Sequence, residues 1–416
     1  MNTSRRKFLK SMSLGGAAAL GGIPVLKAAA PAGNQLVLDP YAGVDWQAWR
    51  RLRAQLHMHT LQSDGHHMLS EVVEAYTAAD YDVLSITDHD FMEPNVHVRS
   101  GRISEDDASP YPREPRPGNY PANTTWPWTD YGAKSPEDYG LIGIEANELT
   151  YRHHTNSYYC GVGFSPSNHD QSLDDAEWND MEIEEIRKAG GLAMLLHPGW
   201  ARESHRKPVD WYVDRFRNHA PETLIGIEVT NVAWDNRKYD EALWDQLLAR
   251  FMPERPVWGY GTDDMHGLAS ARQSFSLLLA PEAGAAAVRE AMAGGRLLFC
   301  RSSNDLDYRA GEFDGFDPFP EVEHIEVDAD AGVIEIAATG ADQIQWISAP
   351  ESLDTTGDYK TDAAPFPEGR VVHEGPRLEL TKTDGIRNYV RAVLRRHSGE
   401  GVQETFTNPF GIAHQA

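Results

Sequence analysis

Residues 53–60, Arg-Ala-Gln-Leu-His-Met-His-Thr, indicate the fold most directly, because they have the pattern of a β-strand that ends in two histidines. Alternate side chains of a strand lie on the same face, so His57 and His59 would project together. Two imidazoles on one face can bind a single metal ion. The stretch therefore predicts a strand with part of a metal site at its carboxyl end.

Further strands and helices alternate between this stretch and Arg301. The strands are expected at 81–89, 141–149, 156–162, 192–197, 224–230, 257–262 and 296–300, and helices at 70–79, 175–189, 239–251 and 281–293. Such alternation is typical of an α/β fold with a mainly parallel sheet, and it favours a barrel. From about Asp317 the pattern changes to apolar–polar alternation without a helical period, which predicts a small antiparallel β domain.

Histidines and carboxylates follow several of the other predicted strands as well. They are Ser-Asp-Gly at 63–65, Thr-Asp-His at 87–89, Glu148 with His154, Leu-His-Pro at 196–198 and Asp-Met-His at 264–266. A single histidine after an apolar strand is more commonly a hydrogen-bonded residue than a ligand. The carboxyl ends of parallel barrel strands, however, meet at one rim, where active sites are built. Together the groups predict a site of His, Asp and Glu ligands, which suits Zn, Mn or Fe(II).

Taken in chain order, these motifs closely resemble those of the polymerase-and-histidinol-phosphatase (PHP) superfamily over residues 50–301. The resemblance implies a distorted seven-stranded (β/α) barrel that holds two or three divalent ions, Mn, Zn or Fe. Most studied members hydrolyse phosphoesters. The ligands implied by motif are His57, His59, Asp64, His89, Glu148, His154, His197, Asp264 and His266. The resemblance also implies an attacking metal-bound hydroxide, held by Glu148, Asp264, His57 and His59.

Two of these ligands have a neighbour of similar type. Glu145 is the alternative to Glu148, but Asn-Glu-Leu-Thr at 147–150 with His-Thr-Asn at 154–156 better matches a family branch with Glu-x-Thr and His-x-Asn. The two glutamates would face opposite ways on a strand, so only one is expected to point inward. Asp263 is the alternative to Asp264, and the Asp-x-His spacing favours Asp264.

Other residues near the predicted rim are candidates for substrate binding. Arg152, His153 and Arg202 are the main ones, and Arg272 also lies near a loop end. Arginine can hold an anionic group, although solvated surface arginines are the commoner case. A Pro- and aromatic-rich insert at about 91–140 is either a pocket wall or a surface excursion held by its own aromatic residues.

The first 32 residues have the pattern of an export signal. Ser-Arg-Arg-Lys-Phe-Leu-Lys at 4–10 is a twin-arginine motif, and a Gly/Ala-rich run follows it, with cleavage expected after Ala32. The run is too short and too glycine-rich for stable membrane insertion. We therefore expect the twin-arginine export machinery as a partner during secretion, and a periplasmic or secreted protein.

Three segments of the chain are expected to be distinct. They are the signal at 1–32, the metal-dependent hydrolase barrel at 44–310 and a C-terminal domain at 318–416. Thr-Asn-Pro-Phe-Gly at 407–411 is similar to the ending of exported PHP proteins in which a β-sandwich follows the barrel. We therefore expect the C-terminal domain to be a β-sandwich without chemistry of its own.

The charge of the chain restricts its partners. Lys and Arg number 38 against 63 Asp and Glu, for a net charge of −25. Such a chain has a poor electrostatic surface for nucleic acid or anionic membrane, so a small-molecule substrate is expected. An anionic substrate would need metal ions or a few arginines to hold it. Two cysteines are too few for a disulfide scaffold.

The leading functional hypothesis is a metal-dependent phosphoesterase, a phosphoric ester hydrolase that acts on a small phosphorylated compound. The main alternative is a carbamate or ester hydrolase with the same metal site, because one PHP branch with a similar His-x-Asn element hydrolyses aryl carbamates. A third hypothesis is an inert barrel that serves as a secreted binding module. Degraded relatives lose several ligands, whereas none is missing from this sequence.

Overall fold

The computed structural model describes residues 33–92, 94–111, 124–164, 172–200, 205–231, 237–302, 318–353, 355, 357–361, 364–398 and 401–415. The predicted signal at 1–32 and Arg202 lie outside these residues. Within the described part of the chain, no helix combines the length and the apolar character needed to cross a bilayer.

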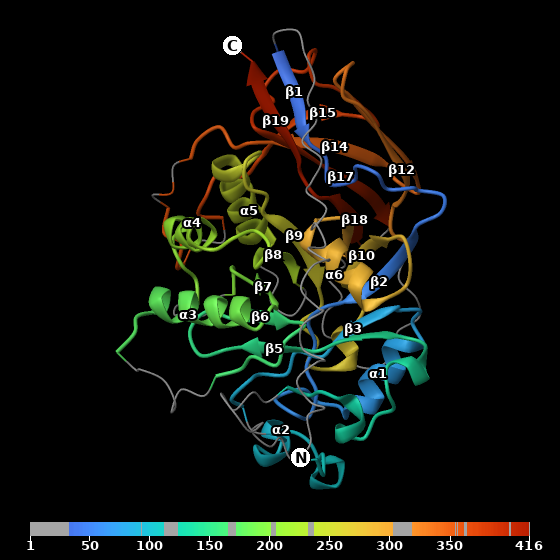
Figure 1. Ribbon diagram of the computed structural model, residues 1–416, viewed down its shortest axis with the longest axis vertical. Helices are drawn as coiled ribbons and strands as arrows, with labels where there is room; N and C mark the ends of the chain where they lie inside the picture. Colours follow the sequence, from blue (N-terminus) through green and yellow to red (C-terminus); the bar gives the residue numbers. More distant parts are fainter. Residues whose placement is uncertain are drawn as a thin grey trace, which may run out of the picture.

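The protein is a mixed α/β fold in which strands predominate over helices (Figure 1). The strands before residue 303, other than β1, are β2 (Arg50–Gln55), β3 (Val83–Ser85), β4 (Ile142–Ile144), β5 (Ala146–Leu149), β6 (Thr155–Tyr158), β7 (Leu192–Leu195), β8 (Leu224–Asn231), β9 (Trp258–Thr262), β10 (Ser274–Ala280) and β11 (Leu297–Ser302). The α-helices are α1 (Leu69–Thr77), α2 (Val96–Arg99), α3 (Asp175–Lys188), α4 (Val209–Asn218), α5 (Arg237–Phe251) and α6 (Ala285–Ala293).

Local sequence explains where the clearest of these helices begin and end. The Asp174 side chain accepts hydrogen bonds from the backbone N–H groups of Ala176 and Glu177, and Glu177 completes a capping box at the start of α3. Gly190, with a φ of +76°, follows the end of this helix. α4 follows Pro208 and was not predicted, although its buried face packs Tyr212 and Phe216 into the core.

The strands that carry the predicted ligands form two groups. One is the run β10-β2-β3-β4 of the largest sheet, in which β2, β3 and β4 are parallel. The other is the five-stranded sheet β5-β6-β7-β8-β9, in which β7, β8 and β9 are parallel. Isolated parallel bridges join the two groups, Met58 to Met265 and His89 to Glu148. The ends of both groups therefore meet.

The prediction of a mainly parallel sheet is wrong for β6 and β10. β6 is antiparallel to both β5 and β7. β10 was not predicted as a strand, and it pairs antiparallel with β2 and β11. The direction of β6 matters for the site, because it brings the amino end of β6, where His154 lies, to the same rim as the carboxyl ends of its neighbours.

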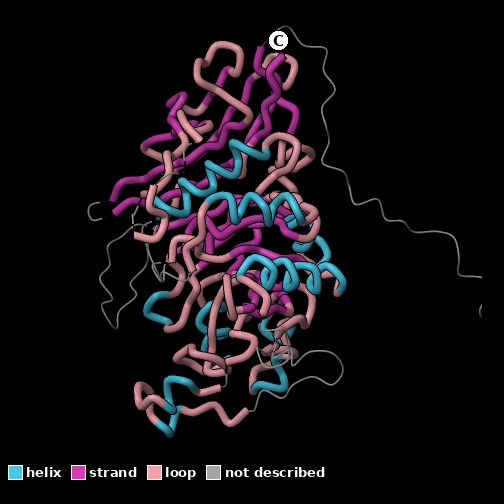
Figure 2. Tube along the Cα trace, turned by 90° about the vertical axis from the view of Figure 1, so that its left-hand side faces the viewer, coloured by secondary structure: helices cyan, strands magenta, loops and turns pink. Residues whose placement is uncertain are grey.

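The C-terminal part of the chain is antiparallel, as predicted. Its strands are β12 (Glu321–Asp328), β13 (Val333–Thr339), β14 (Gln343–Ser348), β15 (Arg370–Glu374), β16 (Arg377–Glu379), β17 (Tyr389–Ser398), β18 (Gly401–Thr407) and β19 (Phe410–Gln415). β12, β13 and β16 form a separate three-stranded sheet, which shares a core with β14, β17 and β19 through buried residues such as Ile334, Trp346 and Phe410. Figure 2 shows these strands gathered at one end of the molecule, with most of the helices in the remainder.

Two pairings tie this region to the rest of the chain. β18 pairs with β11, so the largest sheet continues from the α/β part into the C-terminal part. The first described strand, β1 (Gly33–Leu38), pairs antiparallel with the last, β19 (Figure 1). In addition, the buried Asp245 of α5 accepts hydrogen bonds from Arg391 Nε at 2.9 Å and from Tyr389 Oη at 2.7 Å on β17.

Candidate metal centre

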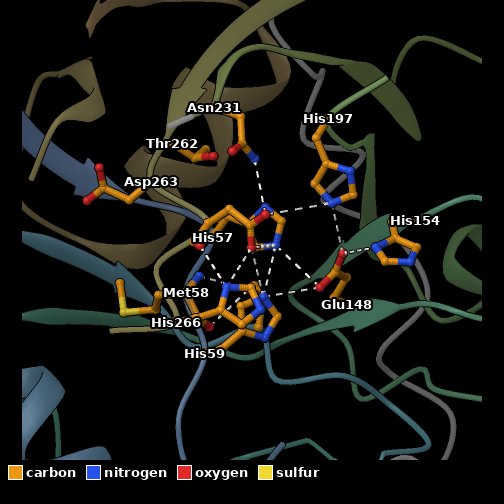
Figure 3. A network of polar contacts seen from close by, with 12 residues as sticks. His57, Met58, His59, Glu148, His154, His197, Asn231, Thr262, Asp263 and His266 are labelled. Carbon is orange, nitrogen blue, oxygen red and sulfur yellow. Dashed lines mark hydrogen bonds and ion pairs between the residues drawn. The ribbon is translucent and has the colours of Figure 1, made fainter. Parts of the chain in front are cut away.

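All nine predicted ligands lie together at the rim where the two groups of strands meet. Each belongs to at least one set of three or four His, Asp or Glu side chains whose ligand atoms lie within 4.8 Å of one another. Figure 3 shows Glu148 between His154 and His197 on one side and His57 and His59 on the other. The residues come from loops and strands far apart in the sequence, as the motifs predicted.

Glu148 of β5 is the centre of this arrangement. Its side chain is buried, and its two oxygens approach ring nitrogens of five histidines at 2.6 to 3.4 Å. These are His57, His59 and His89 at Oε2, and His154 and His197 at Oε1. One carboxylate therefore contacts all the predicted histidine ligands except His266.

Asp264 lies beside this carboxylate, two residues after the end of β9. Its Oδ1 is 3.1 Å from His59 Nε2 and 3.3 Å from His57 Nε2. Asp264 has a φ of +47° and His197 a φ of +22°. Such left-handed conformations cost free energy for residues other than glycine and persist where surrounding structure holds them, often at functional sites.

Asp64 forms the more open edge of the site. Its oxygens lie 3.4 Å from His89 Nε2, 3.5 Å from His266 Nε2 and 3.7 Å from His59 Nδ1. Gly65 follows it where a Cβ atom would lie 2.5 Å from the backbone of His59. The glycine of the Ser-Asp-Gly motif is therefore required by the close approach of this turn to the histidine strand.

The arrangement of donor atoms fits divalent cations better than hydrogen bonding alone. The Nε2 atoms of His57 and His59 face each other at 3.2 Å, and both also face carboxylate oxygens. Glu148 Oε2 and Asp64 Oδ1 are buried and have no hydrogen bond of good geometry among the described residues. Several lone pairs that converge on the same space are what a metal site requires.

The electrostatics of the site are those of tightly paired charges. Burial opposes charge on His57, but the carboxylates of Asp264, Glu228 and Glu148 raise its pKa well above the ordinary value. Burial likewise opposes charge on Glu148, yet the surrounding histidines, His89 first, hold its pKa well below the ordinary value. Burial lowers the pKa of His154 to about 4, which leaves a neutral ring able to bind metal.

Glu228 of β8 was not predicted. Its Oε1 lies 2.8 Å from His57 Nδ1 and accepts a hydrogen bond from the Thr262 hydroxyl, and its Oε2 accepts from the backbone N–H of His197 at 2.7 Å. A carboxylate in this position fixes the orientation of a metal-binding histidine. The one feature that could have indicated Glu228 is that it is an acidic residue in the middle of the strand Leu224–Asn231, all eight residues of which are buried.

Asp88 of the Thr-Asp-His motif has a supporting position. It accepts hydrogen bonds from the backbone N–H and the hydroxyl of Thr60, both at 2.7 Å, from Ser63 Oγ at 2.7 Å and from Thr125 Oγ1 at 2.6 Å. These bonds hold the loop that carries Asp64. The sequence marked this aspartate as part of a cluster but did not indicate that it supports the loop.

The two alternative ligands lie away from the cluster. Glu145 is partly exposed, and its Oε1 accepts a hydrogen bond from Thr124 Oγ1 at 3.5 Å. Asp263 is buried on the other side of the backbone, where it accepts hydrogen bonds from Gln55 and Tyr76 (Figure 3). The structure thus brings Glu148 and Asp264 into the cluster, while their role as ligands stays a prediction.

A cavity of about 620 Å³ lies over the cluster, a size typical of sites for small molecules. Its walls include three aromatic side chains, Phe91, Tyr151 and Trp200, and the cations Arg102 and Arg152. The predicted insert contributes Phe91, Met92, His97 and Arg102 to this wall, and it also packs against the core through the buried Trp128.

The predicted substrate-binding residues are placed differently from one another. Arg152 lines the cavity and lies 3.4 Å from Asp175. His153 is buried outside the cavity, with Nε2 3.0 Å from the Tyr212 hydroxyl. Arg202 lies outside the described residues. His205, which was not predicted, lines the cavity and stacks on His153.

Comparisons with known proteins give distant likenesses only. No protein-family profile matches the chain, and no curated protein matches it. One similar solved structure is a two-domain protein from Bacteroides vulgatus ATCC 8482 that contains a predicted PHP-like metal-dependent phosphoesterase. It is 15% identical, and the match covers 88% of this chain and 94% of that chain with a TM-score of 0.43.

Two further structures match a smaller part of the chain. PsfC from Pseudomonas syringae PB-5123 is 13% identical, with 58% of this chain and 87% of that chain covered and a TM-score of 0.34. A candidate metal-dependent phosphoesterase from Bifidobacterium adolescentis ATCC 15703 is 15% identical, with 51% and 87% covered and a TM-score of 0.32. Likenesses this distant do not decide an activity.

Proposed function

We propose that this protein is a metal-dependent hydrolase of PHP type, and that phosphoester hydrolysis is its reaction. The observation that carries the proposal is the buried carboxylate of Glu148, which faces five imidazoles with Asp264 beside it. This donor set suits two or three ions of Mn, Zn or Fe. When bound, such ions supply Lewis acidity that activates water and neutralises charge on an ester oxygen.

The residues of the chain would divide the work by position. His57, His59 and Asp264 form one set of ligands, and Glu148, His154 and His197 form another. A third set is His59, Asp64, His89 and His266. Glu228 and Thr150 would hold the rings of His57 and His89, because Glu228 Oε1 lies 2.8 Å from His57 Nδ1 and Thr150 Oγ1 lies 2.7 Å from His89 Nδ1.

The substrate would enter the cavity above these ligands. Arg102 and Arg152 line that cavity and can pair with an anionic group, and the cluster would supply further positive potential once its ions are bound. The whole chain has a net charge of −25, which disfavours binding of an anionic substrate to its general surface. A small phosphorylated compound fits this distribution of charge.

The proposal extends to the architecture and to the compartment. A distorted seven-stranded barrel would arise if β4 and β5 count as one bent strand and the Met58–Met265 bridge closes the ring. Residues 44–310 would then be the barrel and 318–416 a β-sandwich. Residues 1–32 would direct export by the twin-arginine machinery to the periplasm or beyond. The intact mass of exported protein tests this last point, and a mature chain that does not begin at Gly33 would contradict it.

A substrate panel tests the activity. The purified protein would be loaded with Mn, Zn or Fe and assayed on phosphomonoesters, phosphodiesters and aryl carbamates, with its His59→Ala variant beside it. We expect turnover of phosphoesters that requires metal and is lost in the variant. Activity on none of the phosphoesters would overturn the proposal, and so would equal activity of the variant.

Aryl carbamate or ester hydrolysis is the second candidate, and one observation favours it. Phe91, Tyr151 and Trp200 line the cavity beside the cluster, and such side chains suit an uncharged ring. The same panel separates the two candidates, because activity on carbamates alone would select this one. The complete set of predicted ligands at the rim argues against an inert binding module.

A further inference from the structure

The turn that carries His197, residues 197–200, is bonded to a buried aspartate that the proposed function does not use. The turn follows β7, and the Trp200 backbone N–H donates to the His197 carbonyl at 2.9 Å. Asp240, in the first turn of α5, is 3% exposed and accepts a hydrogen bond from the backbone N–H of Gly199 at 2.6 Å. The start of α5 is therefore bonded directly to the turn that carries a predicted ligand.

This turn has a conformation that needs support. His197 has a φ of +22°, and such a conformation persists only where the surrounding structure holds it. Two buried acids supply acceptors: Glu228 Oε2 for the N–H of His197 at 2.7 Å, and Asp240 Oδ1 for the N–H of Gly199. Arg206 Nε donates to the Gly199 carbonyl at 2.9 Å. Gly199 is thus held at both its N–H and its C=O.

The position of the turn decides where two parts of the site lie. His197 Nε2 is 3.2 Å from Glu148 Oε1, and these two residues form one set of ligand atoms with His154 (Figure 3). The Trp200 ring lines the cavity, with its centre 5.1 Å from that of the His154 ring. Gly199 lies between His197 and Trp200 in the chain, so a shift of its backbone would move both side chains.

The helix that carries Asp240 is itself anchored. Asp245, five residues later in α5, accepts a hydrogen bond from Arg391 Nη2 at 2.8 Å and from the backbone N–H of Gly369 at 2.9 Å. Both donors belong to the antiparallel C-terminal region. This region therefore holds the helix from which Asp240 reaches the turn.

We infer that Asp240 is a positioning residue for the metal centre: through the backbone of Gly199 it holds the His197 ring beside Glu148. It thereby increases the affinity of the set Glu148, His154 and His197 for a divalent cation. The inference rests on the metal centre of the proposed function and not on which bond is hydrolysed.

The role of Asp240 requires an acceptor and not a charge, because its partner is a backbone N–H. Burial raises the pKa of Asp240 well above the ordinary value, which likewise favours a neutral group at this position. Asparagine should therefore replace Asp240, whereas alanine should not.

Competition for Zn²⁺ between the metal-free full chain and a chelating dye tests the inference. Asp240→Ala should weaken one zinc site by about 10- to 100-fold, the range typical for partners that orient a ligand. Asp240→Asn should stay within about threefold of the parent, since it keeps an acceptor. Asp214→Ala, at an exposed position of α4, is the matched control and should leave zinc binding unchanged. If Asp240→Ala does not fold, Asp240→Leu removes the acceptor while filling the space.

A double-mutant cycle separates positioning of His197 from a general loss of stability. His197→Ala removes the ligand itself, so adding Asp240→Ala should weaken zinc binding no further. Additive losses in the double variant, parent-like affinity in Asp240→Ala, or no recovery in Asp240→Asn would each overturn the inference. Zinc binding by a parent that hydrolyses no ester would overturn the proposed function alone, and absence of zinc binding would overturn both.

Discussion

Asp263 and Asp264 are neighbours in the chain and both are buried, yet they lie in opposite surroundings. Asp263 accepts hydrogen bonds from Gln55 Nε2, Tyr76 Oη and three successive backbone N–H groups at 272–274, at 2.5 to 2.9 Å. Asp264 faces the rings of His57, His59 and His266 instead.

The difference separates a structural acid from a site for a ligand. The protein itself supplies a donor for nearly every lone pair of Asp263, so nothing more is needed there. Around Asp264 and Glu148, acceptor atoms converge on one another and some have no hydrogen bond among the described residues. A buried carboxylate that is fully bonded indicates a fixed loop, whereas one surrounded by imidazoles indicates a cation.

Glu148→Gln should have the largest effect, because it removes the charge that all three sets of ligands share or adjoin. We expect metal content to fall and turnover to decrease by about ten-thousandfold, about 5 kcal/mol. Elemental analysis and steady-state assays measure both. Glu145→Gln is the matched control and should keep both values. Full metal content in Glu148→Gln would contradict the assignment of Glu148 to a metal site.

Asp264→Asn should rank next, since it removes one terminal carboxylate rather than the shared one. Turnover should decrease by about a thousandfold, about 4 kcal/mol. The free energy of unfolding of the metal-free protein should decrease less than in Asp263→Asn, because Asp264 lacks the three backbone N–H donors that bind Asp263. Urea unfolding in the presence of a chelator checks this, and a large loss of stability there would make Asp264 a structural residue like its neighbour.

Glu228→Gln should have an intermediate effect through the His57 ring. The amide can still accept one hydrogen bond, but it no longer favours the tautomer that presents Nε2 to a metal. We expect metal affinity or turnover to decrease by about 10- to 100-fold. Competition with a chelating dye measures the affinity. If the variant equalled the parent, the carboxylate would have no influence on the site.

Asp263→Asn should lower the stability of the protein and leave its metal content unchanged. An amide nitrogen would face donors such as Tyr76 Oη and the backbone N–H groups, so the free energy of unfolding should decrease by about 1–3 kcal/mol. Urea unfolding measures it, with Asp384→Asn at an exposed position as control. Loss of metal with unchanged stability would reverse the roles assigned to the two aspartates.

The pH dependence of stability gives the smallest signal. Burial raises the pKa of Asp263 to about 6, although its hydrogen-bond donors oppose the shift. The folded state therefore holds this proton at pH values where the unfolded state has lost it, and stability falls as pH rises from about 4 to 6, by at most about 1.4 kcal/mol per unit. Asp263→Asn should show a shallower slope over this window in urea unfolding at several pH values. An unchanged slope would mean that Asp263 does not titrate there.

The residues that gather at the rim could be predicted from the sequence because most of them lie at or just beyond the end of a strand and because the motif spacing is local. His57 and His59, for example, need only the alternation of a strand. Glu228 could not be found in this way, because its partner His57 is 171 residues away in the sequence. The residues next to Glu228 do not indicate which side chain it contacts. The same limit applies to β6, whose antiparallel direction depends on its neighbours.

The overall arrangement was predicted less completely. The change to an antiparallel C-terminal region was visible as a change in period. β18 pairs with β11, and β1 pairs with β19. Neither pairing could be predicted, because nothing in the sequence of one strand identifies its partner. β10 was not predicted, although it lies between β11 and β2 within the largest sheet. It falls between the predicted strand at 257–262 and the predicted helix at 281–293.

The pairing of β1 with β19 also sets the timing of folding during synthesis. Gly33 is opposite Gln415, so the first described strand has no partner until the ribosome has made the last one. The histidine-bearing strands can assemble earlier, while the two ends of the chain remain apart. Completion of the largest sheet is therefore a late event, and it comes only once translation has reached the far end of the chain.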